Sequence, residues 1–164
     1  MKFRLILLIA ITTILVSLVR SQEQTNKHSM HPTNQDEMNK RGDKVMGFDH
    51  TLTTHHFVLT KDGGTIEVSA NSATDSESRD QIRKHLSHIA MMFAEGNFKA
   101  PILIHEQNPP GVPVMQRLKS DIEYSFEKTD SGGRVRISTK NEEARRAIHQ
   151  FLRFQIKAHT PDQL

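Results

Sequence analysis

One local pattern, two short strands followed by an amphipathic helix, occurs twice in this chain and restricts what it can fold into. In the first occurrence residues 55–60 are aromatic, β-branched or apolar, and in residues 65–70 Ile66 and Val68 alternate with polar residues. The intervening residues 61–64 (KDGG) adopt turn conformations at little steric cost. Period-two alternation on either side of such a turn predicts an antiparallel β-hairpin with one buried face.

A helix is predicted directly after this hairpin. Its apolar residues recur at steps of four, three and four and therefore share one helical face: Ile82, Leu86, Ile89 and Phe93. Three polar residues are candidate N-caps: Asp75, Ser76 and Ser78. Gly96 is the expected end of the helix. We expect the helix to lie across the apolar face of the hairpin.

The second occurrence follows the same order. Residues 122–127 alternate between apolar and polar, residues 130–133 (DSGG) form the next turn, and residues 134–139 return as a strand. Asn141 is expected to cap a helix that reaches about Ala158. The chain is therefore predicted to be an α+β protein, in which two ββα units form a four-stranded antiparallel sheet with both helices on one face, as a pseudo-repeat. Chance similarity between short units is the alternative.

The N-terminus has the composition of a secretory signal peptide. Basic residues precede an uncharged run at residues 5–19, which is shorter than the roughly 20 residues that span a bilayer. We expect residues 1–21 to be a signal peptide cleaved near Ser21, and the mature chain to be periplasmic or secreted. An uncleaved N-terminal membrane anchor is the alternative, because Arg20 beside the cleavage site is unusual.

The composition argues against several classes of protein. Of the 22 Lys and Arg residues, three precede Ser21, which leaves 19 against 19 Asp and Glu. A neutral mature chain does not favour binding to nucleic acid or to an anionic membrane. Because the chain has no cysteine, disulfides, thiolate metal sites and a lipid-modified N-terminal cysteine are excluded.

Residues 22–43 are polar and lack any period, so we expect a flexible linker that leads into a single α+β domain at residues 44–164. The linker contains His28, Met30 and His31. Imidazole and thioether ligands together suit copper. The alternative is that these residues are only part of a polar tail.

The ten histidines all lie beyond the leader, and their placement is the main functional signal. In the first strand His55 has the phase of Phe57 and should face the covering helix, whereas His56 should face the opposite way. In the first helix His85, His88 and Met92 follow one another at steps of three and four, which forms a stripe beside the apolar face.

The second unit lacks this stripe, since Ala147 and Gln150 stand where the first unit has its two helix histidines. We therefore predict a metal site for copper or, second, zinc, with ligands drawn from these residues: His85, His88, His55, His50, His56, Met92 and His105. The alternative is that the histidines bind neighbours or solvent and that Met92 packs in the core. His149 and His159 are expected at the surface.

A stiff, proline-rich connection is predicted between the two units. Pro101 and residues 107–113 (QNPPGVP) do not suit a sheet interior, because proline fixes φ and lacks a donor. This stretch is expected to form the lip of a cleft. Residues 114–120 are a short helix candidate, with Pro113 in its first turn.

Several short segments resemble one group of proteins. These segments are residues 46–49 (MGFD) and, four residues later, 54–57 (THHF), with residues 63–64 (GG), 109–113 (PPGVP) and 151–154 (FLRF). They resemble small exported bacterial proteins for which no function is established, and the resemblance runs from about residue 46 to the C-terminus. Some members carry transcarbamylase-like labels, but this chain is too short for such a domain pair and has no phosphate-cradling loop.

Three classes of function are consistent with these features. The first is an exported metal-binding protein, with copper favoured over zinc. The second is a non-catalytic module that binds another cell-envelope protein without a metal. The third is a hydrolase with a histidine base and Asp49 or Glu106, which ranks last because the chain has no nucleophile elbow and no H-E-x-x-H motif.

Overall fold

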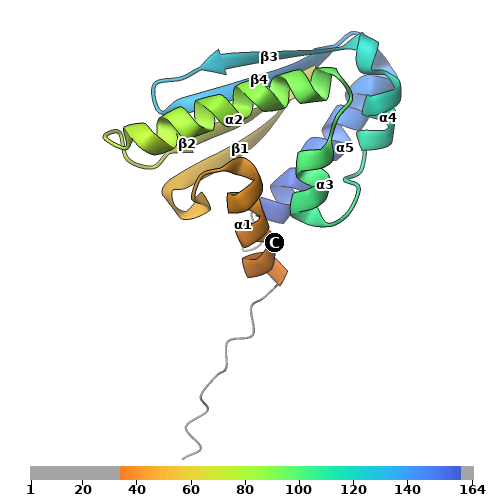
Figure 1. The fold of residues 1–164 in the computed structure, drawn as a ribbon. Coiled ribbons are helices and arrows are strands. Elements are labelled where there is room, and N and C mark those ends of the chain that lie inside the picture. The colour runs from red at the N-terminus through yellow and green to blue at the C-terminus, as the bar shows by residue number, and fades with distance from the viewer. Residues whose placement is uncertain (1–33, 160–164) are drawn as a thin grey trace, which may run out of the picture. The chain divides into compact units, whose positions relative to one another are not determined.

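Two β-hairpins join along their second strands to form the sheet. In the computed structural model, which describes residues 34–159, β1 (Thr53–Thr60) pairs antiparallel with β2 (Gly63–Ala70), and β3 (Ile122–Lys128) pairs antiparallel with β4 (Gly132–Thr139). Since β2 and β4 also pair antiparallel, the strand order is β1-β2-β4-β3 (Figure 1). The predicted α+β class and four-stranded antiparallel sheet are confirmed.

The strand register separates an apolar face from a polar face. Phe57, Ile66, Val135 and Phe126 are consecutive partners across the four strands, and they pack in the hydrophobic core or against it. One residue further along, on the opposite face, Arg134 Nε lies 3.4 Å from a carboxylate oxygen of Glu127. The alternation predicted from the sequence therefore decides which face the helices cover.

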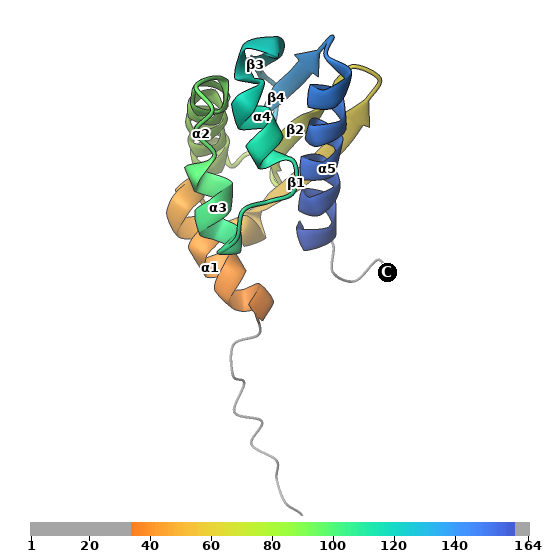
Figure 2. The ribbon, with the colours of Figure 1, turned by 90° about the vertical axis from the view of Figure 1, so that its right-hand side faces the viewer.

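Two long helices contact the sheet. α2 (Ser76–Ala94) contacts mainly β4 and β3, and α5 (Glu142–His159) contacts mainly β1 and β2 (Figure 2). The first helix was predicted to cover its own hairpin, but it lies mainly on the second hairpin and contacts β2 to a smaller extent. Arg83 accounts for part of this difference, because its guanidinium donates to Thr129 O (2.7 Å) and Gly132 O (3.0 Å) and so ties α2 to the β3–β4 turn.

The predicted helix ends are confirmed. Asp75 caps α2 by accepting a hydrogen bond from the backbone N–H of Ser78 (3.0 Å), and Asn141 Oδ1 accepts from the backbone N–H of Glu143 (2.9 Å) at the start of α5. Gly96 follows α2 with φ 78°, a left-handed conformation that glycine adopts without strain.

The two glycines of the first hairpin have a different role from the one predicted. Residues 61–62 form the turn, and Gly63 and Gly64 begin β2. A Cβ on Gly64 would overlap the Leu152 side chain of α5 and lie 2.5 Å from Val58 O. Gly64 is thus needed for close packing between the hairpin and α5.

The substitution Gly64→Ala is expected to destabilise the domain by about 2–3 kcal/mol through overpacking. Urea unfolding of the variant measures this loss. The control is Gly42→Ala in α1, where the nearest atom is the flexible end of Met46 at 3.3 Å and helix propensity favours alanine by about 1 kcal/mol. Equal stability of Gly64→Ala and the unchanged protein would contradict the packing role.

Two short helices form the connection between the hairpin units. α3 (Lys99–His105) carries the buried Pro101 in its first turn, and α4 (Val112–Arg117) has Pro113 in its first turn, as predicted, although it begins earlier than expected. Single 3₁₀ turns, η1 (His50–Leu52) and η2 (Lys119–Asp121), lead into β1 and β3.

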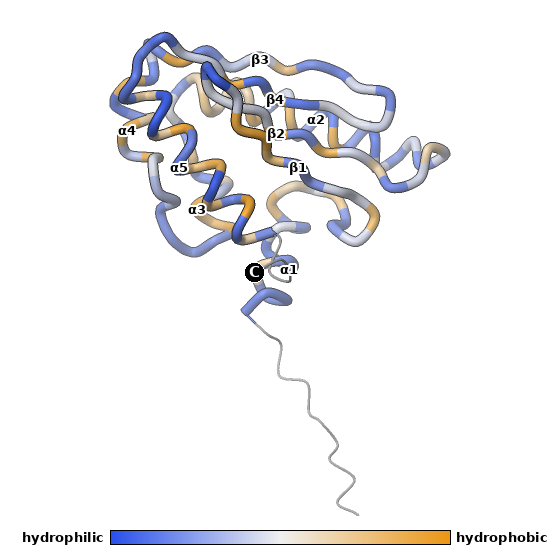
Figure 3. The backbone as a smooth tube through the Cα atoms, turned by 180° about the vertical axis from the view of Figure 1, so that it is seen from behind, coloured by the Kyte–Doolittle hydropathy of each residue, from blue (hydrophilic) through white to orange (hydrophobic). Residues whose placement is uncertain are grey.

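A further helix, α1 (Asn34–Met46), lies where the sequence predicted the end of a flexible linker. Figure 3 shows α1 as mostly hydrophilic, but Met38 and Gly42 are buried, and with Met46 they recur every four residues. Arg41 fixes this helix to α3, because its Nε donates to Ile104 O (3.0 Å). A single face with little apolar area is enough to hold a helix that is polar elsewhere, and this is why composition failed to predict it.

Other predictions concern residues outside the described range. The signal peptide at residues 1–21 and the linker histidines His28 and His31 fall there. Within residues 34–159, no helix combines the length and the apolar character needed to cross a membrane.

Candidate functional site

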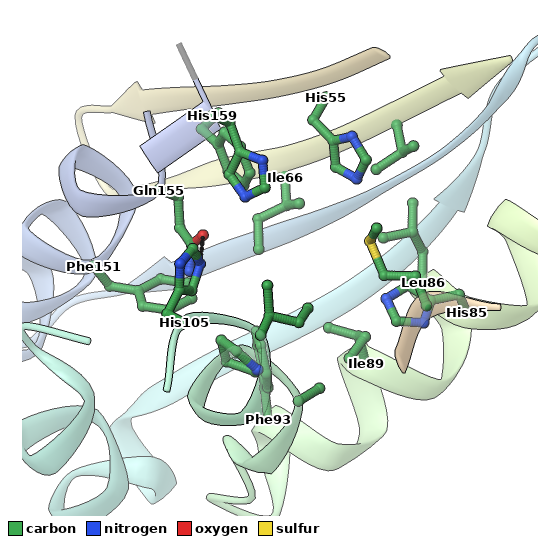
Figure 4. Close-up of a pocket in the computed structure, with 16 residues that line it drawn as sticks. His55, Ile66, His85, Leu86, Ile89, Phe93, His105, Phe151, Gln155 and His159 are labelled. Atoms are coloured by element: carbon green, nitrogen blue, oxygen red, sulfur yellow. Dashed lines mark hydrogen bonds between the residues drawn. The ribbon is translucent and has the colours of Figure 1, made fainter. Parts of the chain in front are cut away.

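A cavity of about 70 Å³ lies between the apolar face of the sheet and helices α2, α3 and α5 (Figure 4). Most of its wall is apolar, and Met46 of α1 contributes to it. Four histidine side chains also line it, and we call the space the histidine cavity: His55, His85, His105 and His159. A volume of this size holds a few water molecules or a small ligand.

Each histidine comes from a different element. His55 lies on β1 and shares the inward phase of Phe57, and His85 lies on α2 one turn before the buried Ile89. His105 and His159 are the last residues of α3 and α5. The cavity is therefore formed only by the tertiary arrangement, because no local segment contains more than one of its imidazoles.

Aromatic contacts hold three of the rings in place. The rings of His55 and His159 stack with centroids 5.5 Å apart and an interplanar angle of 11°. The buried Phe48 stacks on His55 at 6.0 Å and meets His85 edge-on at 5.6 Å. Phe48 thus contacts imidazoles from both β1 and α2.

Burial favours the neutral form of all four imidazoles. Burial, followed by the effect of neighbouring imidazoles, lowers the pKa of His55 and of His85 to about 4 and that of His159 to about 3. Burial also lowers the pKa of His105, although its hydrogen bond to Gln155 acts in the opposite direction. Neutral imidazole is the form that binds a metal, because it retains a nitrogen lone pair.

The ring nitrogens are largely free of protein partners. Among residues 34–159, no residue forms a hydrogen bond with a ring nitrogen of His55, His85 or His159. His105 Nε2 donates to Gln155 Oε1 at 2.9 Å, which leaves its Nδ1 as the acceptor nitrogen. The cavity therefore presents uncommitted donors and acceptors on a mostly apolar wall.

The remaining predicted ligands lie outside the cavity. His88 and His56 are exposed, and each lines a surface groove that borders the cavity at His85 or at His55. His50 also lines the second of these grooves. Met92 is half-buried on α2 and does not line the histidine cavity.

His50 belongs to a separate cluster with two aspartates. Its backbone N–H and its Nδ1 both donate to Asp43 Oδ1, at 2.8 and 2.9 Å, and Asp49 Oδ1 lies 4.0 Å from the same Nδ1. In the described part of the chain this is the one group of three or more His, Asp or Glu side chains whose ligand atoms lie within 4.8 Å of each other. The hydrogen bonds from His50 to Asp43 explain this closeness without a metal.

Comparisons of the chain with models of protein families, with curated proteins and with solved structures find no match.

Two residues that line the cavity were not predicted from the sequence as site residues. His159 was expected at the surface, yet it follows Phe151 and Gln155 at steps of four, so the helical period already places it on the buried face. Met46 precedes the hairpin, and no local pattern connects it with the cavity. His149, also expected at the surface, is half-buried and donates from Nε2 to Thr60 O at 3.0 Å, which gives it a structural role.

Proposed function

We propose that this chain is an exported metal-binding protein that holds copper, or second zinc, in the histidine cavity. The observation that carries this proposal is that His55, His85 and His159 are neutral, share one cavity and have ring nitrogens without described partners. The thioether of Met46 is a further soft ligand at the same cavity. Imidazole and thioether together favour copper over the harder divalent ions.

Binding requires a rearrangement of the rings. No three histidine ligand atoms within residues 34–159 lie within 4.8 Å of one another, so a metal ion would bring at least two of these side chains closer together.

The proposed export and the proposed duplication both bear on this site. The signal peptide would deliver the protein to the periplasm or the medium, where the chain's lack of cysteine leaves histidine and methionine as ligands.

The strands support the proposed pseudo-repeat. One constant shift in residue number aligns Gly63 with Gly132, Phe57 with Phe126 and Ile66 with Val135. Ile66 and Val135, which are equivalent in this alignment, are also partners across the two central strands β2 and β4.

Contacts of the helices support the remaining part of the fold proposal, that α2 and α5 lie on one face. Phe93 of α2 and Phe151 of α5 both line the histidine cavity together with Ile66 of the sheet. On the same offset, Tyr124 of β3 corresponds to His55, so the second unit carries no equivalent of the strand histidine. The metal site would thus belong to the first unit and to the ends of α3 and α5.

A titration of the metal-stripped chain with copper and with zinc tests the proposed function. We expect saturable binding, and we expect the double variant His55→Ala, His85→Ala to bind at least about tenfold more weakly, as loss of ligands does. The matched control is His56→Ala, His88→Ala, which removes the exposed neighbour of each ligand on the same strand and helix. The control should bind as the unchanged protein does.

Equal binding by both double variants, or no saturable binding at all, would contradict a metal function for the cavity. The alternative is then a non-catalytic module of the cell envelope. That function predicts capture of a partner protein that is unaffected by chelators and by the His55→Ala, His85→Ala substitutions.

A further inference from the structure

The wall of the histidine cavity contains no formally charged side chain. Of its sixteen lining residues, four are the neutral histidines and one is Gln155, and the others are apolar. No charged group of the wall therefore offsets the charge of a cation in this cavity.

The energetic cost of placing an ion in an uncharged cavity depends strongly on the charge of the ion. The cost of transferring an ion from water into a poorly polarisable surrounding rises with the square of its charge, so a divalent ion costs about four times as much as a monovalent ion of the same size. Many sites for divalent ions in proteins offset this cost with carboxylates or thiolates, whereas zinc held by three histidines needs a water or substrate molecule as its fourth ligand. The wall of the cavity contains no carboxylate and no thiolate.

The spacing of the ligands leads to the same distinction. Zinc requires about four ligands in a tetrahedral arrangement, whereas monovalent copper and silver are stable with two, and soft ligands select them. No three histidines among residues 34–159 have ligand atoms within 4.8 Å of one another, which favours an ion that needs fewer ligands.

We infer that the histidine cavity selects a soft monovalent cation, Cu(I) or its analogue Ag(I), over Cu(II) and Zn(II). This inference rests on the proposed function and narrows its ligand. The neutral nitrogens of His55, His85 and His159 and the sulfur of Met46 form the candidate ligand set. The Asp43 and His50 pair near the cavity has the opposite character, because its carboxylate suits a divalent ion.

The test is a competition titration of the full chain with Ag(I) in chloride-free buffer, with Cu(I) under anaerobic conditions and with Zn(II). Only the binding that is lost in the double variant His55→Ala, His85→Ala and kept in His56→Ala, His88→Ala counts as binding in the cavity. For that component we expect Ag(I) and Cu(I) to bind at least about 100-fold more tightly than Zn(II), because the divalent charge is not compensated. Zinc binding that Asp43→Asn abolishes belongs to the surface pair and leaves the expectation for the cavity in force.

A second variant changes the selectivity in a defined direction. Gln155→Glu places a carboxylate in the cavity wall next to His105, and we expect it to raise the affinity for Zn(II) relative to Ag(I) by at least about tenfold. If cavity binding of Zn(II) in the unchanged protein equals that of Ag(I), the inference is wrong although the proposed function stands. If no ion depends on His55 and His85, both are wrong.

Discussion

Replacing Phe151 with alanine is expected to destabilise the domain by about 3–5 kcal/mol, the range for removing a large aromatic side chain from a packed core. Phe151 is 1 % exposed and meets the rings of Phe93 and Phe98 edge-on, each at a centroid distance of 6.0 Å. These three residues come from α5, α2 and the start of α3, so the substitution removes contacts among three helices at once. Urea unfolding at pH 7 measures the loss.

The matched control is Arg153→Ala, two residues further along α5. Arg153 is exposed, and we expect its replacement to change stability by no more than about 0.5 kcal/mol. Because Phe151 also lines the histidine cavity, its loss should enlarge that space. A Phe151→Ala variant within about 1 kcal/mol of the unchanged protein would show that the core does not depend on this aromatic cluster.

The elements of the fold were predictable because they depend on local sequence. Alternation around residues 61–64 predicted the first hairpin, and Asp75 and Asn141 predicted the helix starts through their capping side chains. Each of these signals concerns contacts within a few residues. Such contacts recur wherever the sequence recurs, whatever surrounds them.

The positions of helices over the sheet were not predictable in the same way. That α2 contacts mainly β4 and β3 depends on contacts such as Arg83 with Thr129 O, between residues far apart in the chain. Helix α1 depends on Met38 and Gly42 packing next to α3, and these two residues alone give no amphipathic pattern that composition would reveal. Long-range packing decided both cases.

The candidate site was predictable from the sequence only in part. His55 was correctly assigned to the covered face and His56 to the open face from the strand period alone. The helix stripe was only partly informative, because His85 lines the cavity while His88, one turn later, is exposed. The margin of a helix includes both buried and exposed positions, and only the neighbouring elements decide between them.

Acidification from pH 7 to about pH 4 is expected to lower the free energy of unfolding by several kcal/mol. The folded pKa is about 4 for His55 and His85 and about 3 for His159, whereas an unfolded histidine titrates near pH 6.5. Between these values the unfolded chain binds more protons than the folded one, so stability falls as the pH falls. In this range of pH, each such histidine lowers the free energy of unfolding by up to about 1.4 kcal/mol for each pH unit of acidification.

Carboxylates affect a lower range of pH and can be separated from the histidines. Hydrogen bonds lower the pKa of Asp62 and Asp75, so the stability that these groups contribute is present above their unfolded pKa and is lost only below about pH 4. A loss of stability that begins near pH 6.5 therefore reports the imidazoles of the histidine cavity.

Urea unfolding at intervals from pH 7 to pH 4 measures this dependence, and one pair of variants assigns it. His85→Asn removes one half-buried imidazole and should reduce the slope by up to about 1.4 kcal/mol per pH unit between pH 6.5 and 4. His88→Asn removes an exposed imidazole from the same helix, and we expect the slope to be unchanged. If the free energy of unfolding does not change down to pH 4.5, the folded and unfolded chains bind protons equally well. This result would contradict the lowered pKa values of the cavity histidines.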